Sequence, residues 1–218
     1  MDYVELIFAK ILANVKGHEA GRFTKGPAFT SFPHPTIIVT SSDCGPSGST
    51  LPIDYTQEGA SLFPSLSWTP LPDTQEYMLV VQDVDAPVPN PIGHGVFYGI
   101  PASKTSVNDG YFEPIKGTRK KPQGTHLTGG FKRGANFRGT VYDGPRALKG
   151  HGPHRYFFMV VALGEKLDDS QLSAVPRRKE LAKVVQGKVL GWGEWMGVSE
   201  RKWRVNDGTE EGEGEHRD

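Results

Sequence analysis

Apolar residues follow two periodicities along the chain, and each periodicity predicts a different kind of element. Within residues 2–16 they recur every three or four positions, which predicts an amphipathic helix. A second helical pattern covers residues 177–190, where Pro176 precedes the first turn and Gly191 follows the last. We expect the first helix to pack its apolar stripe on the body of the protein.

Between these helices the apolar residues form short runs that are rich in β-branched and aromatic side chains. Turn signals of Gly, Pro and Ser separate the runs, without regular helical patterns between them. The runs predict strands at residues 36–40, 63–68, 77–81, 96–100, 156–163 and 195–201. Strands in series without intervening helices indicate a mainly β, antiparallel fold.

Composition narrows the classes of protein to consider. Lys plus Arg and Asp plus Glu number 25 each, so no net charge attracts nucleic acid, and we expect none as a partner. A single cysteine, Cys44, excludes an internal disulfide and a cysteine-based zinc site. No run approaches the roughly 20 apolar residues of a transmembrane segment, and the N-terminus lacks a secretory signal pattern. We therefore expect a cytoplasmic protein.

Charge patterning divides the chain further. We predict a helix and linker over residues 1–32, one β domain over 33–205 and a disordered acidic tail over 206–218. Residues 115–141 carry seven Lys or Arg side chains and no acid. This basic segment either guides an anionic ligand or is a solvated loop, and the sequence leaves both open.

The first chemical cluster follows the strand at residues 77–81. Asp83 and Asp85 stand two positions apart there, with His94 a few residues later. In an extended chain the two carboxylates would face the same way, and each would raise the proton affinity of the other. The alternative is that both only accept hydrogen bonds from turn amides.

The second cluster is Gly152-Pro153-His154-Arg155-Tyr156, which leads into the strand at 156–163. His154 and Tyr156 alternate onto one face and could donate together to an oxyanion. A core histidine with a satisfied hydrogen bond is the alternative. The histidine and aspartate spacing matches no standard metal site, and no phosphate-binding loop or dinucleotide fingerprint is present. We expect neither a metal nor a cofactor.

These clusters, with Leu66-Ser67-Trp68 upstream, resemble the ordered motifs of the phosphatidylethanolamine-binding protein (PEBP) family over roughly residues 33–203. The family's first motif is matched by Asp83-Val84-Asp85-Ala86-Pro87. The resemblance implies an antiparallel β-sandwich with a C-terminal helix and a small anion-binding pocket. The ligand-binding residues that it implies are Asp83, Asp85, Pro87, His94, Tyr142, Gly144, Pro145, Gly152, His154 and Tyr156.

The chain departs from the family pattern around this pocket. Val84 replaces a proline, and Gly93 and Gly95 flank His94 where relatives commonly carry large aromatic side chains. We expect these glycines to open space beside His94. The resemblance also makes the Ala86–Pro87 bond a candidate cis peptide.

Three functions are compatible with the resemblance, and the sequence leaves open whether the protein is an enzyme. The first is a binding module for a lipid headgroup or another small anionic or carboxylate-bearing metabolite. The second is a fungal secondary-metabolite enzyme of the kind that dimerises anhydride monomers into maleidrides. In it His94 or His154 would act as base, Asp83 or Asp85 would orient it, and Tyr156 would stabilise an enolate. The third is a protein-interaction regulator of a kinase or protease.

Overall fold

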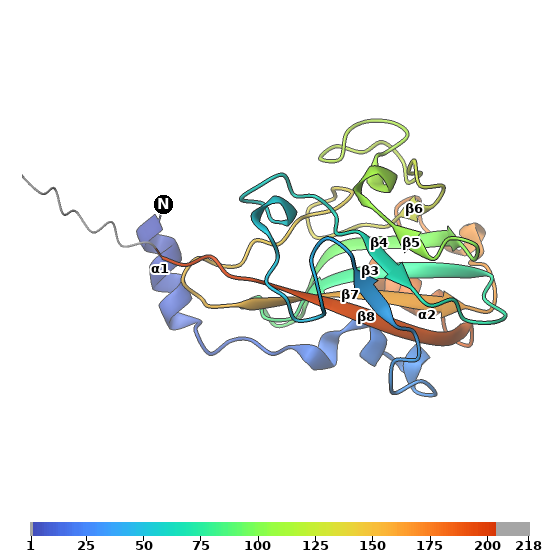
Figure 1. Cartoon of the computed structure of the whole chain (residues 1–218), viewed down its shortest axis with the longest axis horizontal. Helices are drawn as coiled ribbons and strands as arrows, with labels where there is room; N and C mark the ends of the chain where they lie inside the picture. The colour runs from blue at the N-terminus through green and yellow to red at the C-terminus, as the bar shows by residue number, and fades with distance from the viewer. Residues whose placement is uncertain (1, 204–218) are drawn as a thin grey trace, which may run out of the picture.

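The computed structural model describes residues 2–203 as two antiparallel sheets with few helices (Figure 1). The segment predicted to form a disordered tail lies outside these residues. The helices are α1 (Asp2–Ile11) and α2 (Arg178–Val184). The strands are β1 (Val39–Ser41), β2 (Leu66–Trp68), β3 (Glu76–Asp83), β4 (Ile92–Pro101), β5 (Ser106–Val107), β6 (Lys132–Arg133), β7 (His154–Leu163) and β8 (Val189–Ser199). Short 3-10 turns occupy Glu19–Gly21, Phe23–Lys25, Pro27–Phe29, Ile53–Tyr55, Asp109–Phe112 and Asp169–Gln171.

The larger sheet has the strand order β6-β4-β3-β7-β8, and the smaller has the order β1-β2-β5. All of these strand pairs are antiparallel. Strand β3 is central and pairs with both β4 and β7 along most of its length. The structure thereby confirms the predicted antiparallel β-sandwich.

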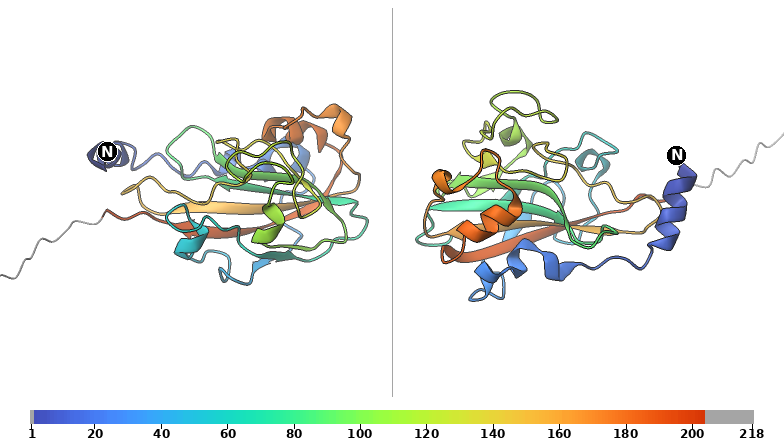
Figure 2. Two further views of the ribbon diagram at one scale, coloured as in Figure 1. Left: turned by 90° about the horizontal axis from the view of Figure 1, so that it is seen from above. Right: turned by 180° about the vertical axis from the view of Figure 1, so that it is seen from behind.

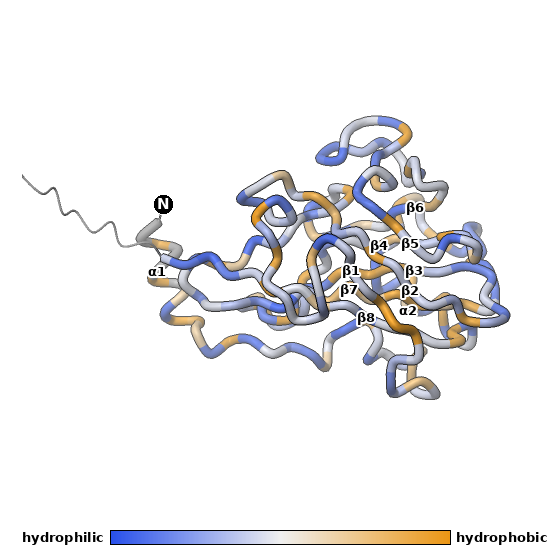
Figure 3. The backbone as a smooth tube through the Cα atoms, in the orientation of Figure 1, coloured by the Kyte–Doolittle hydropathy of each residue, from blue (hydrophilic) through white to orange (hydrophobic). Residues whose placement is uncertain are grey.

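Strands β3 and β7 are buried on both faces, because the large sheet is covered on each side. Tyr77 and Leu79 point into the core between the sheets, whereas Met78 and Val80 point to the opposite side. On that side α2 and the 3-10 turns of residues 19–29 cover the sheet (Figure 2). This double burial explains why both strands read as continuous apolar runs. Figure 3 shows hydrophobic segments among the strands in the middle of the molecule.

Several element boundaries differ from the sequence prediction. The helix predicted at 177–190 ends at Val184, and a turn with Gly187 at φ 76° separates it from β8. Strand β8 begins at Val189 rather than at residue 195, and it pairs with nearly all of β7. Pairing with a long buried strand outweighs the helical periodicity at its start. Strand β4 begins at Ile92, four residues early, which places His94 inside the sheet.

Helix α1 is shorter than the predicted helix over 2–16, and its apolar side chains are not all packed. Ala9 is buried, but Val4, Ile7 and Ile11 are more than half exposed. Beyond the helix, the chain of residues 12–19 runs along the end of the large sheet (Figure 1). Within residues 2–203 no helix is long and apolar enough to cross a membrane. The cytoplasmic location stays a prediction.

Candidate functional site

Three strand ends bring the two sequence clusters together at one end of the large sheet. Asp83, at the end of β3, pairs with Ile92 at the start of β4 and with Tyr156 near the start of β7. Antiparallel pairing therefore places residues about 70 positions apart side by side. A pocket of about 210 Å³ opens there. Its lining residues are Gln57, Asp83, Ala86, Pro87, Ile92, His94, Phe137, Arg138, Asp143, Arg146, Ala147, Leu148 and His154.

Asp83 is the hydrogen-bonding centre of this end of the sheet. Its Oδ1 accepts the backbone N–H groups of Asp85 at 2.8 Å and Ala86 at 3.0 Å. Its Oδ2 lies 2.9 Å from Nδ1 of His154. The carboxylate thus closes the turn after β3, as an Asx turn does, and also fixes the orientation of a histidine ring.

The hydrogen-bond chain continues past His154 to the N-terminal segment. His154 Nε2 lies 2.8 Å from Nδ1 of His151, and His151 Nε2 lies 2.9 Å from the carbonyl oxygen of Leu12. A carbonyl only accepts, so His151 donates to Leu12. The chain therefore joins Asp83, His154 and His151 to the N-terminal segment in one buried network.

His94 differs because only one of its ring nitrogens has a partner among the described residues. Nδ1 lies 2.8 Å from the carbonyl oxygen of Asp143 and therefore carries a proton. Burial lowers the pKa of His94, against the raising effect of the Asp83 and Asp143 charges. At neutral pH the ring is then neutral, and Nε2 presents a lone pair to the pocket.

The two tyrosines expected at the site lie beneath the pocket rather than in its lining. The Tyr156 ring contacts the His94 ring edge-to-face at a centroid distance of 5.1 Å. The Tyr142 ring contacts Phe63 at 4.8 Å in the core between the sheets. Both hydroxyls are buried without a hydrogen-bond partner in residues 2–203. Burial raises the pKa of both tyrosines well above the usual range.

Asp85 does not form the expected proton-sharing pair with Asp83. The strand ends at Asp83, so the alternation of side chains does not reach Asp85. Its oxygens accept hydrogen bonds from the Arg155 guanidinium at 2.7 Å and from the Gly17 amide at 3.0 Å. Burial raises the pKa of Asp85, but the Arg155 contacts outweigh it, and the pKa is lower than usual. Asp85 thus ties the N-terminal segment to β7, outside the pocket lining.

The glycine and proline residues expected at the site hold the surrounding loops in place rather than line the pocket. The Gly144 amide donates to Ser61 Oγ at 2.9 Å, and the Gly144 and Pro145 carbonyls accept from Gln57. A side chain at Gly144 would collide with Ser61. Gly152 adopts a φ of 94°, which turns the chain between His151 and His154. None of the three lines the pocket.

The structure adds pocket residues that the sequence analysis did not select. Arg138 and Arg146 lie at the mouth with exposed side chains, and Asp143 and Gln57 stand beside them. Arg138 belongs to the basic segment of residues 115–141, and the charge of that segment was the one sequence feature that pointed to it. Elsewhere in that segment, Arg119 binds Asp109 at 2.7 Å, and most of the segment is loop. Gln57 comes from a distant loop and carried no signal in the sequence.

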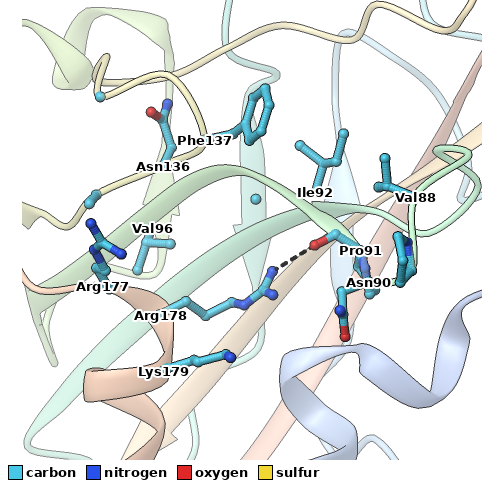
Figure 4. Close-up of a pocket in the computed structure, with 14 residues that line it drawn as sticks. Val88, Asn90, Pro91, Ile92, Val96, Asn136, Phe137, Arg177, Arg178 and Lys179 are labelled. Atoms are coloured by element: carbon cyan, nitrogen blue, oxygen red, sulfur yellow. Dashed lines mark hydrogen bonds between the residues drawn. The ribbon is translucent and has the colours of Figure 1, made fainter.

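The glycines beside His94 differ in effect. A side chain at Gly95 would meet the Phe97 ring at 2.7 Å, so bulky neighbours already fill that space, contrary to expectation. Gly93 instead faces a groove of about 780 Å³ (Figure 4).

The Ala86–Pro87 bond is trans, as are all peptide bonds in the described part of the chain. No group of three His, Cys, Asp or Glu residues there could hold a metal ion.

Comparison with known proteins gives one family and two close fungal relatives. Residues 41–200 match the model of the family described as phosphatidylethanolamine-binding protein. A Talaromyces stipitatus protein named phomoidride biosynthesis cluster protein B is 40% identical over 93% of this chain and 83% of its own. A protein of the same name from Fungal sp. is 38% identical over 92% of this chain and 95% of its own. The structure of E. coli YbcL, titled a new member of the mammalian PEBP family, superposes with a TM-score of 0.62 at 25% identity, covering 75% of this chain and 98% of that one.

Proposed function

Because the chain belongs to the phosphatidylethanolamine-binding protein family, we propose that its pocket binds a carboxylate-bearing metabolite and that the protein serves in fungal secondary-metabolite biosynthesis. The names of the two fungal relatives support the pathway assignment. The alignment with the first covers 204 of the 218 residues, so it includes the segment around residue 17 that holds Asp85. That likeness extends beyond the part matched by the family model.

The observation that carries the proposal is the open Nε2 of His94. Its Nδ1 is held by the Asp143 carbonyl, and its pKa is lowered by burial, so Nε2 is an unprotonated acceptor at neutral pH. A fixed imidazole in this state is suited to act as a general base. It can remove a proton from a carbon next to the bound carboxyl or anhydride group and later return that proton.

Charge at the pocket supports an anionic ligand. The guanidinium groups of Arg138 and Arg146 are exposed at the mouth, whereas the Asp83 carboxylate is buried and already bound to backbone amides and to His154. Guanidinium groups bind carboxylates through paired, charge-assisted hydrogen bonds. We assign ligand capture to the two arginines and proton transfer to His94.

The remaining predicted catalytic groups take supporting roles in this proposal. His154 has both nitrogens engaged, so it stabilises the turn rather than accepting the substrate proton. Tyr156 supports the His94 ring from below, and its buried hydroxyl is outside the lining. Oxyanion stabilisation therefore falls to the arginine side chains at the mouth.

The test is an amide NMR titration with butylsuccinate and, separately, with phosphorylethanolamine. We expect saturable shifts near Asp83, His94 and Asp143 with butylsuccinate, which are lost in an Arg138→Ala/Arg146→Ala variant. Lys120→Ala/Lys121→Ala is the matched control, because it removes the same charge from exposed sites outside the pocket. Saturation by phosphorylethanolamine alone would indicate a headgroup module instead, and no saturation by either would refute an anion pocket.

Proton transfer is tested by solvent deuterium exchange into bound butylsuccinic anhydride at the carbon next to the carbonyl. We expect His94→Gln to slow the protein-dependent exchange at least about 100-fold, since this is the usual contribution of a general base. His154→Gln should slow it much less. Equal loss in both variants, or none in either, would contradict the role of His94.

A further inference from the structure

A second groove adjoins the pocket and has no part in the proposed chemistry. It measures about 780 Å³ and lies between the β3–β4 loop, the 135–139 loop and the start of α2. Its apolar lining comes from Val88, Pro89, Pro91, Ile92, Val96 and Phe137. Phe137 is 71% exposed and adds an aromatic surface to this apolar lining.

The groove and the pocket share a wall. Ile92 and Phe137 line both, and His94 follows Gly93, whose missing side chain leaves the groove open toward Arg178. A side chain at Gly93 would contact the Arg178 guanidinium, since its first carbon would lie 3.6 Å from it. A molecule that is anchored at His94 and extends into the groove would therefore pass Ile92 and Phe137.

Positive charge collects at the far side of the groove. Figure 4 shows Ile92 and Phe137 on one side and Arg177, Arg178 and Lys179 on the other. Arg178 donates to the Pro91 carbonyl at 3.2 Å, and no ion pair with it is found among residues 2–203. Its burial lowers its pKa, as desolvation of a cation does. No Asp or Glu lines the groove to balance the three cations.

We propose that the pocket and the groove form one extended site for a dianionic small molecule with an apolar body. One carboxylate lies between His94 and the arginines Arg138 and Arg146. The apolar body crosses Ile92 and Phe137, and a second carboxylate pairs with the cations of Arg177–Lys179. This inference rests on the proposed function and adds the size and the second charge of the ligand.

The experiment measures dissociation constants for two series of probes, alkanoates and α,ω-alkanedioates of four to twelve carbons. We expect each methylene that enters the groove to raise affinity about threefold. At the length that spans both subsites, the dicarboxylate should bind about tenfold more tightly than the monocarboxylate of equal length. In an Arg177→Ser/Lys179→Ser variant this advantage should disappear, whereas butyrate affinity stays unchanged, because both residues line only the groove.

The outcomes separate this inference from the proposed function. If butyrate binds but neither chain length nor the second carboxylate changes affinity, the extended site is refuted and the pocket stands. If the long dicarboxylates bind through Arg177 and Lys179 but are insensitive to Arg138→Ala/Arg146→Ala, the groove is an independent site, which also refutes a single extended one. If no probe of either series binds, both proposals fail.

Discussion

His154 and His94 lie at the same end of the large sheet, yet their surroundings differ. Both are almost fully buried, and each has one nitrogen held by an oxygen. The second nitrogen of His154 continues a hydrogen-bond chain through His151 to the Leu12 carbonyl. His94 lines the pocket, and its second nitrogen has no partner within residues 2–203.

The difference separates a closed side, where both nitrogens of His154 are bound, from an open side, where one nitrogen of His94 has no partner in residues 2–203. Where every polar atom has a partner, burial stabilises one arrangement, and removing any member leaves others unsatisfied. At His94 one nitrogen lacks a partner, and burial there lowers the pKa of a ring that can contact a ligand in the pocket. The following predictions probe the closed side at His154 and the open side at His94.

The largest effect should follow from Asp83→Ala. It removes the acceptor of two backbone amides and of His154 in a buried site. We expect the free energy of unfolding to fall by about 3–5 kcal/mol, measured from urea denaturation midpoints. Asp83→Asn should cost clearly less, because its amide keeps an acceptor for the turn and a donor for the ring. Equal losses would show that the turn does not depend on this hydrogen-bond pattern.

The difference in the free energy of unfolding between His154→Ala and His94→Ala should be smaller. His154→Ala removes a buried hydrogen-bond partner from both Asp83 and His151, whereas His94→Ala removes one only from the Asp143 carbonyl.

 The Asp143 residue is only half-buried, so water can replace the lost ring there. We expect His154→Ala to lower the free energy of unfolding by about 1–3 kcal/mol more than His94→Ala, again from urea midpoints. The reverse order would contradict the assignment of closed and open sides.

Carboxylate affinity should depend on pH through His94. Burial lowers the pKa of His94 below the ordinary 6.5 in the free protein, and a bound anion raises it again. As pH falls below the pKa of His94 in the complex, affinity should rise by up to about tenfold per pH unit, and it should level off at the lowered pKa of the free protein. Calorimetry in buffers of different ionisation enthalpy should show proton uptake on binding.

The control for this pH dependence is His94→Gln, which should bind with a flat profile over the same range. The free energy of unfolding should change with pH in the opposite direction to the affinity. The unfolded state binds the proton more readily than the folded state, so the His94 contribution is complete above pH 6.5 and is lost as pH falls. A ligand profile that keeps its slope in His94→Gln would assign the titration to another group.

The smallest effect, a change in ligand affinity, should follow from Arg138→Ala at the mouth of the pocket. Arg138 is exposed and bonds weakly to Gln57 at 3.4 Å. Arg138→Ala should raise the dissociation constant for butylsuccinate about threefold at low salt, and less at high salt, because exposed ion pairs are screened. Lys120→Ala should leave it unchanged. Loss of all binding in Arg138→Ala would show that this side chain is a buried anchor instead.

Much of the fold could be read from the chain, but not its boundaries. The apolar runs located β3 and β7 because both faces of these strands are buried, which leaves an unmistakable pattern. The start of β8 was missed, since its residues fit a helical stripe equally well and only pairing with β7 decides the matter. Helix α1 was overextended for the same reason: periodicity records amphipathicity and not where a helix ends.

The site was predictable in part. The motifs pointed to Asp83, Pro87, His94 and His154, and all four line one pocket. Asp85 was grouped with them because spacing alone assumed an extended chain through residue 85, whereas the strand ends at Asp83. His151 was not among the site residues expected from the sequence. Its role depends on the Leu12 carbonyl, 139 positions away.

The sequence by itself determined the antiparallel β class, the two motif clusters and the absence of net charge, because these follow from local composition and periodicity. Only the tertiary structure decided that both nitrogens of His154 are engaged while Nε2 of His94 has no partner in residues 2–203. It also decided which carboxylate meets an arginine and which loops bring Arg138 and Phe137 to the pocket of His94. Hydrogen-bond partners and burial are set by strand register and loop packing. These long-range contacts fix the proton affinities on which the proposed chemistry depends.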